Sequence, residues 1–227
     1  MLDTYRVLDL TNDKGQYCGK LLADLGCEVI KIEKPGGDPA RQIGPFYHDV
    51  RDPEKSLFWF ANNRGKKSIT LDIETSQGQT TLKELVKDAD VLIESFDPGY
   101  LDKLGLGYAK LSQINPQIIM ASITPFGQSG PYASYKGPDI VVSALSGFMG
   151  MNGEPDRAPL NTSMPILFPF ASAHATQAIL LALYHRERTG RGQYIDSSVQ
   201  QSVVSNVVDV EYWTEYGLIE GKREGNT

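Results

Sequence analysis

A short basic stretch and two histidines are the first residues in this sequence that could do chemistry. The stretch NNRGKKS carries Arg64, Lys66 and Lys67 beside a glycine. Such a stretch suits phosphate binding, although a solvated run of charges is the more common interpretation. His174 and His185 are eleven residues apart on one expected helix. At about 1.5 Å per residue they lie roughly 16 Å apart, so we expect them not to share a metal ion.

Several common catalytic and nucleotide-binding patterns are absent from the sequence. The turn TNDKGQYCG contains only Gly15 and Gly19, which is not the G-x-G-x-x-G fingerprint of dinucleotide-binding proteins. The sequence has no P-loop, no G-x-S-x-G elbow and no Ser-His-Asp order. Cys18 and Cys27 have the spacing of neither a disulfide framework nor a metal site, so we expect two reduced packing thiols. A dinucleotide dehydrogenase or an NTPase is therefore poorly supported.

The composition is that of an ordinary soluble globular protein. The chain has 227 residues, of which 41% are hydrophobic and 22% are charged, with a net charge of −6. This charge argues against nucleic-acid binding through a basic surface. The start MLDTYRVLDL lacks the apolar core of a signal peptide, and the longest apolar run, near 178–184, is shorter than the ~20 residues of a membrane span. We expect a cytoplasmic protein with no membrane association.

The elements that must position any site alternate between strand and helix through the first 125 residues. We expect strands at 5–10, 28–35, 68–73, 90–96 and 117–124, and helices from 16, at 77–87 and in YAKLSQIN. Loops are expected over 36–46 and over much of 47–66. Further along, we expect helices at 139–150, 171–187 and about 198–216, with QYIDSSV as a short strand or a helix entry. This alternation predicts an α/β fold, a Rossmann-like parallel sheet with helices on both faces.

Two charged residues close the second expected strand. Glu33 and Lys34 stand at its carboxyl end, which in such a sheet faces the adenosine part of a nucleotide. They could meet a ribose or its phosphate, and solvated charges at a strand end are an equally good interpretation.

A succession of motifs from about Tyr5 to Gln201 resembles the class III CoA-transferases of the CaiB/BaiF type. It includes GKLLADLGCEVIKIEKPGGDPAR, NRGKKSITLDI, ADVLIESFDPGYLDKLGLGY, YKGPDIVVSALSG and HRERTGRGQYIDSSVQQS. The resemblance is to formyl-CoA and carnitine-CoA transferases and their relatives, which form interlocked dimers and are about twice this length. It implies a Rossmann-like CoA-binding large domain whose N-terminal portion is 1–197. Residues 198–227 would be a helix leading into the linker and small domain.

The resemblance also implies where coenzyme A binds. In the first turn it points to Lys14 and Gly15, and after the second strand to Lys34. The remaining positions are Leu71, Asp72, Ile73 and Glu74; Ser95, Phe96 and Asp97; Lys103; and Tyr135, Lys136, Gly137, Pro138 and Asp139. No metal is implied, and coenzyme A or acyl-CoA is the substrate.

The family's nucleophile has no counterpart in this sequence. In relatives an Asp attacks the acyl-CoA thioester, and counting back from His185 places that position at Phe168. Phenylalanine has no nucleophilic or titratable group. No Asp or Glu occurs between Ala158 and Arg186.

The resemblance therefore predicts acyl-CoA metabolism, with transfer of CoA between an acyl-CoA thioester and a carboxylic acid. We expect this chain to be the non-catalytic subunit of a heteromer. For the family as a whole, the resemblance implies either a homodimer or a heterodimer with a homologous subunit. Two alternatives stay open: an acyl-CoA racemase or isomerase that uses His174 or Asp139 as acid or base, and a CoA-binding subunit without catalysis.

Overall fold

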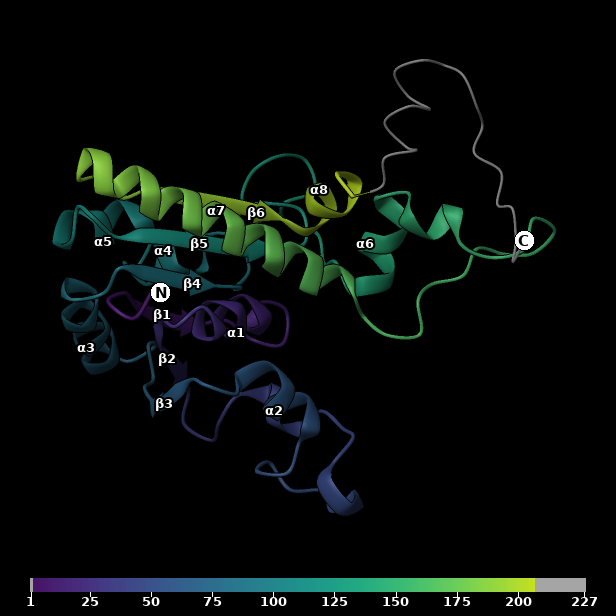
Figure 1. Cartoon of the computed structure of the whole chain (residues 1–227), viewed down its shortest axis with the longest axis horizontal. Helices are drawn as coiled ribbons and strands as arrows, with labels where there is room; N and C mark the ends of the chain where they lie inside the picture. The colour runs from purple at the N-terminus through teal and green to yellow at the C-terminus, as the bar shows by residue number, and fades with distance from the viewer. Residues whose placement is uncertain (1, 207–227) are drawn as a thin grey trace.

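One parallel sheet organises the part of the chain that the structure, a computed structural model, describes, residues 2–206. The strands follow the spatial order β3-β2-β1-β4-β5-β6, and every neighbouring pair is parallel (Figure 1). Their bounds are β1 Arg6–Leu10, β2 Glu28–Glu33, β3 Lys67–Thr70, β4 Val91–Glu94, β5 Ile119–Thr124 and β6 Tyr194–Ser198. This order confirms the Rossmann-like α/β fold, with the reversal of strand order between β1 and β4.

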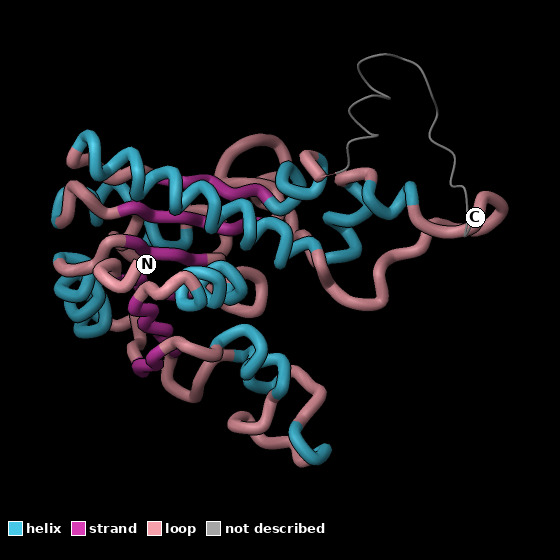
Figure 2. Tube along the Cα trace, viewed as in Figure 1, coloured by secondary structure: helices cyan, strands magenta, loops and turns pink. Residues whose placement is uncertain are grey.

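Helices cover both faces of the sheet (Figure 2). They are α1 Gln16–Asp24, α2 Leu57–Asn63, α3 Ser76–Lys87, α4 Tyr100–Lys103, α5 Tyr108–Ile114, α6 Asp139–Leu145, α7 Leu167–Thr189 and α8 Val199–Val204. Alternate strand residues face opposite ways, so Val7 joins an apolar cluster with α1 and α7, whereas Leu8 joins another with α3 and α5. Two separate cores therefore hold the sheet between its helices.

Helix α7 is the longest described element, and it is a core helix. Its mean hydropathy reaches 1.3 over an 18-residue window, and 50% of that window is buried within the fold. Helices buried in soluble proteins share this length and composition with membrane spans, so the burial explains the apolar sequence. Gly190, with φ of 69°, ends the helix in the left-handed conformation that glycine favours.

The structure differs from the sequence-based expectation in residues 36–66. This segment was expected to be mostly loop, but it contains α2 and two 3₁₀ turns, Pro39–Gln42 and Tyr47–Asp49. The Ser56 side chain accepts a hydrogen bond from the N–H of Trp59 and so begins α2. The Arg41 guanidinium lies 4.0 Å from the centre of the Trp59 ring. This local cap and the more distant Arg41 contact stabilise a helix that is too short to show a clear hydrophobic period.

The other differences are at element ends. Helix α7 begins at Leu167 rather than 171, because Pro169 is tolerated in the first turn of a helix. The expected helix at 139–150 is α6 followed by a 3₁₀ turn at Phe148–Met151. QYIDSSV contains a strand, β6. The expected helix at 198–216 is described only as α8, and its remainder lies outside the described residues.

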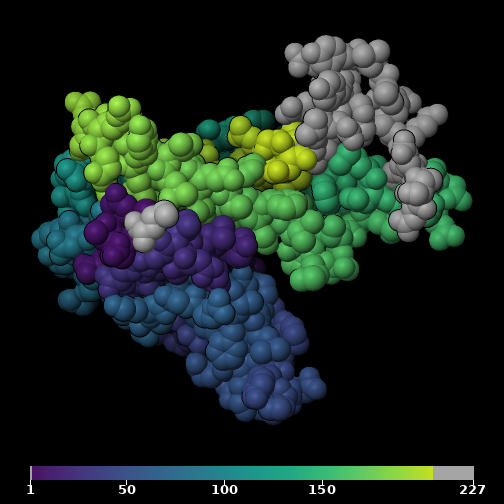
Figure 3. Space-filling view, viewed as in Figure 1, coloured from purple at the N-terminus to yellow at the C-terminus, as the bar shows by residue number. Residues whose placement is uncertain are grey.

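Two segments project from the layered sheet. The first contains residues 39–63 with α2, and the second contains residues 139–166 with α6 (Figure 3). Both leave from the carboxyl ends of strands, and the sites below lie near their bases.

Candidate functional site

A cavity of about 370 Å³ lies at the carboxyl ends of β1, β2, β3 and β4. This is the edge where open parallel sheets bind ligands, beside the reversal of strand order. The walls include six of the positions that the sequence suggested for coenzyme A: Lys34, Leu71, Asp72, Ile73, Glu74 and Phe96. Residues 34, 71–74 and 96 are far apart in the chain, and the fold brings them together.

An aromatic pair forms one wall of this cavity. The ring centres of Phe96 and Tyr100 are 4.7 Å apart, and the Tyr100 hydroxyl donates to Glu74 Oε1 at 2.7 Å. Burial and this carboxylate raise the pKa of Tyr100 to about 12. The wall therefore connects the end of β3 to the turn after β4, and it offers ring surface on which a flat base can stack.

Glu33 lines the cavity but is already paired. Its carboxylate accepts from Arg41 Nε at 2.7 Å and Nη2 at 2.8 Å, from Ser68 Oγ at 2.5 Å and from the Asp38 N–H at 2.9 Å. Burial alone would raise the pKa of Glu33, but the hydrogen bonds lower it to about 2. The interpretation of Glu33 as a solvated charge is therefore wrong, since its oxygens hold the 39–63 segment to the sheet. Lys34 is exposed at the rim.

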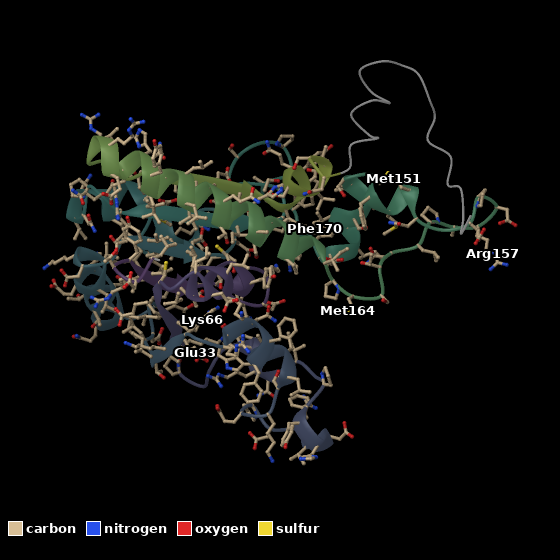
Figure 4. All side chains as sticks on the ribbon, in the orientation of Figure 1. Glu33, Lys66, Met151, Arg157, Met164 and Phe170 are labelled. Carbon is tan, nitrogen blue, oxygen red and sulfur yellow. The ribbon has the colours of Figure 1, made fainter. Side chains whose placement is uncertain are left out.

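The basic stretch is divided between the interior and the surface. Lys66 is 1% exposed at its side chain and pairs with Asp9 Oδ2 at 2.8 Å, so neither phosphate binding nor a solvated charge describes it. Lys67 is exposed and pairs with Glu28 at 2.6 Å, and Arg64 is exposed. Figure 4 labels Glu33 and Lys66 on the side of the sheet that adjoins α2.

The first turn is connected to the turn after β4. The Asn12 N–H donates to Ser95 Oγ, and Ser95 Oγ donates to Asn12 Oδ1, each at 2.9 Å. The Lys14 N–H also donates to Asn12 Oδ1, at 3.0 Å. Thr11 and Asn12 line the cavity, whereas Lys14, Gly15 and Ser95 do not. Asn12 was not among the expected site residues, because a single polar residue in a turn carries no pattern of its own.

The remaining expected coenzyme A positions lie outside this cavity. Asp97 is exposed and lines a second cavity, and Lys103 is exposed in α4. Tyr135 and Lys136 are exposed, Pro138 precedes α6, and Asp139 is its first residue. Gly137 is buried, and a Cβ at this position would lie 2.4 Å from Pro125. Residues 135–139 thus form a separate group near the base of the second projecting segment.

The second cavity, of about 500 Å³, lies over β4, β5 and β6 and was not expected from the sequence. Its floor is the buried Glu94 carboxylate, which accepts from the Phe96 N–H at 2.7 Å. Burial raises the pKa of Glu94 to about 7, against the effect of the Ser122 hydroxyl and this N–H. The Tyr194 hydroxyl donates to Ser122 Oγ at 2.9 Å. The only sequence signal for Glu94 was its place at the end of a strand, next to the expected Ser95.

Phe168 lies in the first turn of α7 and is buried in the apolar cluster on that face of the sheet. A carboxylate from elsewhere reaches the same turn: Asp139 Oδ1 accepts from the Leu167 N–H at 3.3 Å. Burial raises the pKa of Asp139, which this N–H counteracts, and Asp139 Oδ2 is buried without a hydrogen-bond partner. Although the sequence around Phe168 lacks acidic residues, the fold therefore supplies one nearby.

The histidines and cysteines have structural partners. His174 Nε2 lies 3.2 Å from Asn206 Nδ2, and His185 Nδ1 lies 3.3 Å from Thr189 Oγ1. Within residues 2–206, no group of His, Cys, Asp and Glu side chains has the arrangement of a metal site. Cys18 and Cys27 are free and buried, and burial raises their pKa values to about 12 and about 11. The expectation of two packing thiols is confirmed.

Comparisons with known proteins agree with this fold. The family model of CoA-transferase family III matches residues 2–227, and the chain belongs to this family. A CaiB/BaiF family protein from Brucella suis superposes with a TM-score of 0.91 at 39% identity, covering 99% of this chain and 60% of that one. A Mycobacterium tuberculosis protein superposes with a TM-score of 0.85 at 36% identity, covering 95% and 59%.

Curated relatives include two CoA-transferases that act on dicarboxylic acids. The BbsE subunit of succinyl-CoA:(R)-benzylsuccinate CoA-transferase from Thauera aromatica is 38% identical over 96% of this chain and 52% of its own length. Succinate–glutarate CoA-transferase from Agrobacterium fabrum is 42% identical over 90% of this chain and 53% of its own. The chain spans about half the length of the curated relatives it matches.

Proposed function

We propose that this chain binds the coenzyme A part of an acyl-CoA at the 370 Å³ cavity and takes part in CoA transfer to a carboxylic acid. The support is the position of the cavity at the reversal of strand order, its aromatic wall and the exposed Lys34 at its rim. Within this proposal, 1–197 is the N-terminal portion of the large domain and 198–227 leads toward a small domain. The protein is cytoplasmic and uses no metal, and it binds neither nucleic acid nor membranes.

We further propose that the nucleophile comes from a homologous subunit. The support is Phe168, which the motif spacing predicts to stand at the family's Asp position and whose side chain is 7% exposed in an apolar cluster. A carboxylate must reach the thioester carbonyl to form the mixed anhydride, and phenylalanine cannot do so. The name of the relative BbsE, a subunit of a CoA-transferase, fits a chain that works as one of two subunits.

The test compares the chain alone with the chain plus a homologous subunit that has Asp at the position of Phe168. Succinyl-CoA is the first donor to try, because the names of several relatives contain it. We expect CoA transfer to a dicarboxylic acid only in the mixture, with a covalent CoA adduct, detected by mass spectrometry, on the added subunit. Full transfer by the lone chain would contradict the proposal.

A second candidate function rests on Asp139. The Asp139 carboxylate, whose pKa is raised by partial burial and which accepts from the Leu167 N–H in the first turn of α7, could serve as the acid or base of an acyl-CoA racemase or isomerase. The expected result for this alternative is exchange of the α-proton of an acyl-CoA into deuterated water, lost in Asp139→Asn. Asp156→Asn on the same projecting segment is the matched control. CoA binding without either reaction would leave the chain as a binding subunit.

A further inference from the structure

The first turn of the sheet, residues 11–16, rests on a buried network of charged side chains. Asp9, Lys31 and Lys66 have side chains that are 0%, 1% and 1% exposed. Their elements, β1, β2 and the end of the α2 segment, are distant in sequence. Burying a charged side chain costs free energy unless the charge is paired and hydrogen-bonded. The partners of each charged group therefore indicate which parts of the chain the network holds in place.

Asp9 connects the turn to both lysines. Its Oδ1 accepts from the Thr11 N–H at 2.9 Å and the Thr11 hydroxyl at 2.6 Å. Lys31 Nζ lies 3.6 Å from the same oxygen, and Oδ2 accepts from Lys66 Nζ at 2.8 Å. Burial alone would raise the pKa of Asp9, but the two lysines lower it, so this carboxylate is charged.

Lys66 uses all three of its ammonium hydrogens inside the protein. Besides Asp9 it donates to the carbonyl of Gln16 and to Asn63 Oδ1, each at 2.8 Å. The Asn63 amide in turn donates to Gln16 Oε1. The end of α2 and the start of α1 are therefore held on one ammonium group.

Lys31 holds the other end of the turn. Its ammonium group donates to the carbonyl of Thr11 and lies 3.3 Å from Asp38 Oδ2. Thr11 and Asp38 both line the 370 Å³ cavity. Lys31 is thus the link between the buried network and the cavity wall.

Helix α1 lies directly on this network. A Cβ at Gly19 would come within 2.3 Å of Asp9 Oδ2 and 3.1 Å of Lys66 Nζ. Only a residue without a side chain leaves room for the ion pair under the helix. The position of α1, and with it the turn before it, depends on this contact.

We infer that Asp9, Lys31 and Lys66 are positioning residues that hold the Thr11–Gln16 turn in the conformation that forms the coenzyme A cavity. The polar atoms of all three residues contact other groups of the protein, so we expect none of the three to bind the ligand directly. The inference rests on the proposed function in naming coenzyme A, but the effect on the turn does not. Lys31 and Lys66 bind the backbone carbonyls of Thr11 and Gln16, at the two ends of the turn, while Ser95 binds the backbone N–H of Asn12 between them.

The experiment uses Lys66→Met in the full chain, which keeps the length of the side chain but removes the charge. Two quantities are measured: the Kd for CoA by calorimetry, and amide hydrogen exchange of residues 11–16. We expect binding to weaken at least about tenfold, since small misplacements of a site have large effects. Exchange of 11–16 should become faster by about tenfold or more, while β5 stays protected.

A core variant that neither belongs to the turn nor lines the cavity separates positioning from a general loss of stability. Leu111→Ala removes a fully buried side chain in α5. We expect it to lower Tm without changing the Kd for CoA or the exchange of 11–16. If Lys66→Met leaves both unchanged, or if Leu111→Ala changes both equally, the inference is overturned.

A milder variant decides the matter if Lys66→Met does not fold. Asn63→Ala removes one acceptor of Lys66 and one donor to Gln16, at the end of α2. We expect faster exchange of 11–16 and a severalfold weaker Kd, and unchanged exchange would overturn the inference. If the unaltered chain fails to bind CoA, the proposed function is wrong. The hydrogen-exchange data alone then test whether the network holds the 11–16 turn.

Discussion

Two regions of the molecule differ in how their charged groups are paired: the ends of β1 and β2, and the junction of α6 with α7. Around β1 and β2, buried carboxylates and lysines are matched, as in the pairs Asp9–Lys66 and Glu33–Arg41. At the α6–α7 junction, an apolar side chain occupies the first turn of α7, and Asp139 has an oxygen without a partner. The first region is built to hold a fixed shape, which suits binding. The second places an apolar side chain, Phe168, at the start of α7, where we propose that the family nucleophile would otherwise stand.

The largest expected effect comes from breaking the matched charges. Asp9→Asn would leave Lys31 and Lys66 buried without the carboxylate they share, and we expect the free energy of unfolding to fall by about 3–5 kcal/mol. Urea denaturation at neutral pH measures this. Asp102→Asn, an exposed position, is the control and should change stability little. Equal stability of the two variants would remove the contrast between the regions.

The next effect tests whether Phe168 is a packing residue. Phe168→Ala should lower the free energy of unfolding by about 3 kcal/mol, because it leaves a cavity in the apolar cluster. Phe60→Ala, at a position that is 49% exposed, should cost much less. The Kd for CoA should be unchanged in both variants. If Phe168→Ala weakened CoA binding and Phe60→Ala did not, the two regions would belong to one binding site.

A smaller effect appears in the pH dependence of stability. Glu33 has a pKa of about 2 in the folded protein against an ordinary value of 4.5, so its contribution is present above pH 4.5. This contribution, at most about 3 kcal/mol, is lost as the pH falls toward 2. Glu33→Gln should lose that amount at pH 7 and show a flatter acid limb in denaturation curves. A parallel acid limb in both proteins would contradict the pairing with Arg41.

The smallest effect concerns the rim of the cavity. Lys34→Gln should weaken CoA binding about threefold to fivefold, because an exposed lysine contributes a modest, screened attraction to a phosphate. The loss should shrink in high salt. Lys110→Gln, an exposed lysine in α5, should leave the Kd unchanged. Equal losses in both variants would indicate general charge attraction rather than a local contact.

The strands and their parallel order could be predicted because hydrophobic runs and turn residues are local signals. The carboxyl-end cavity follows from that order, which is why Lys34, residues 71–74 and Phe96 lie together as the sequence suggested. The pairing of Lys66 could not be predicted, since Asp9 is 57 positions away and no pattern selects it over other carboxylates. Similarly, Asp139 reaches α7 across 28 positions. The contacts of these groups depend on packing, which a single sequence does not display.

The projecting segment at 39–63 has one further consequence for how the protein unfolds. It stands out from the sheet, yet its residues Asn63 and Arg41 bind groups that are buried beneath it. Detaching the segment would bring water to the Lys66 ammonium group and the Glu33 carboxylate. The segment and the β1–β2 half of the sheet should therefore melt in one cooperative transition, with no stable intermediate in which only the projection is lost.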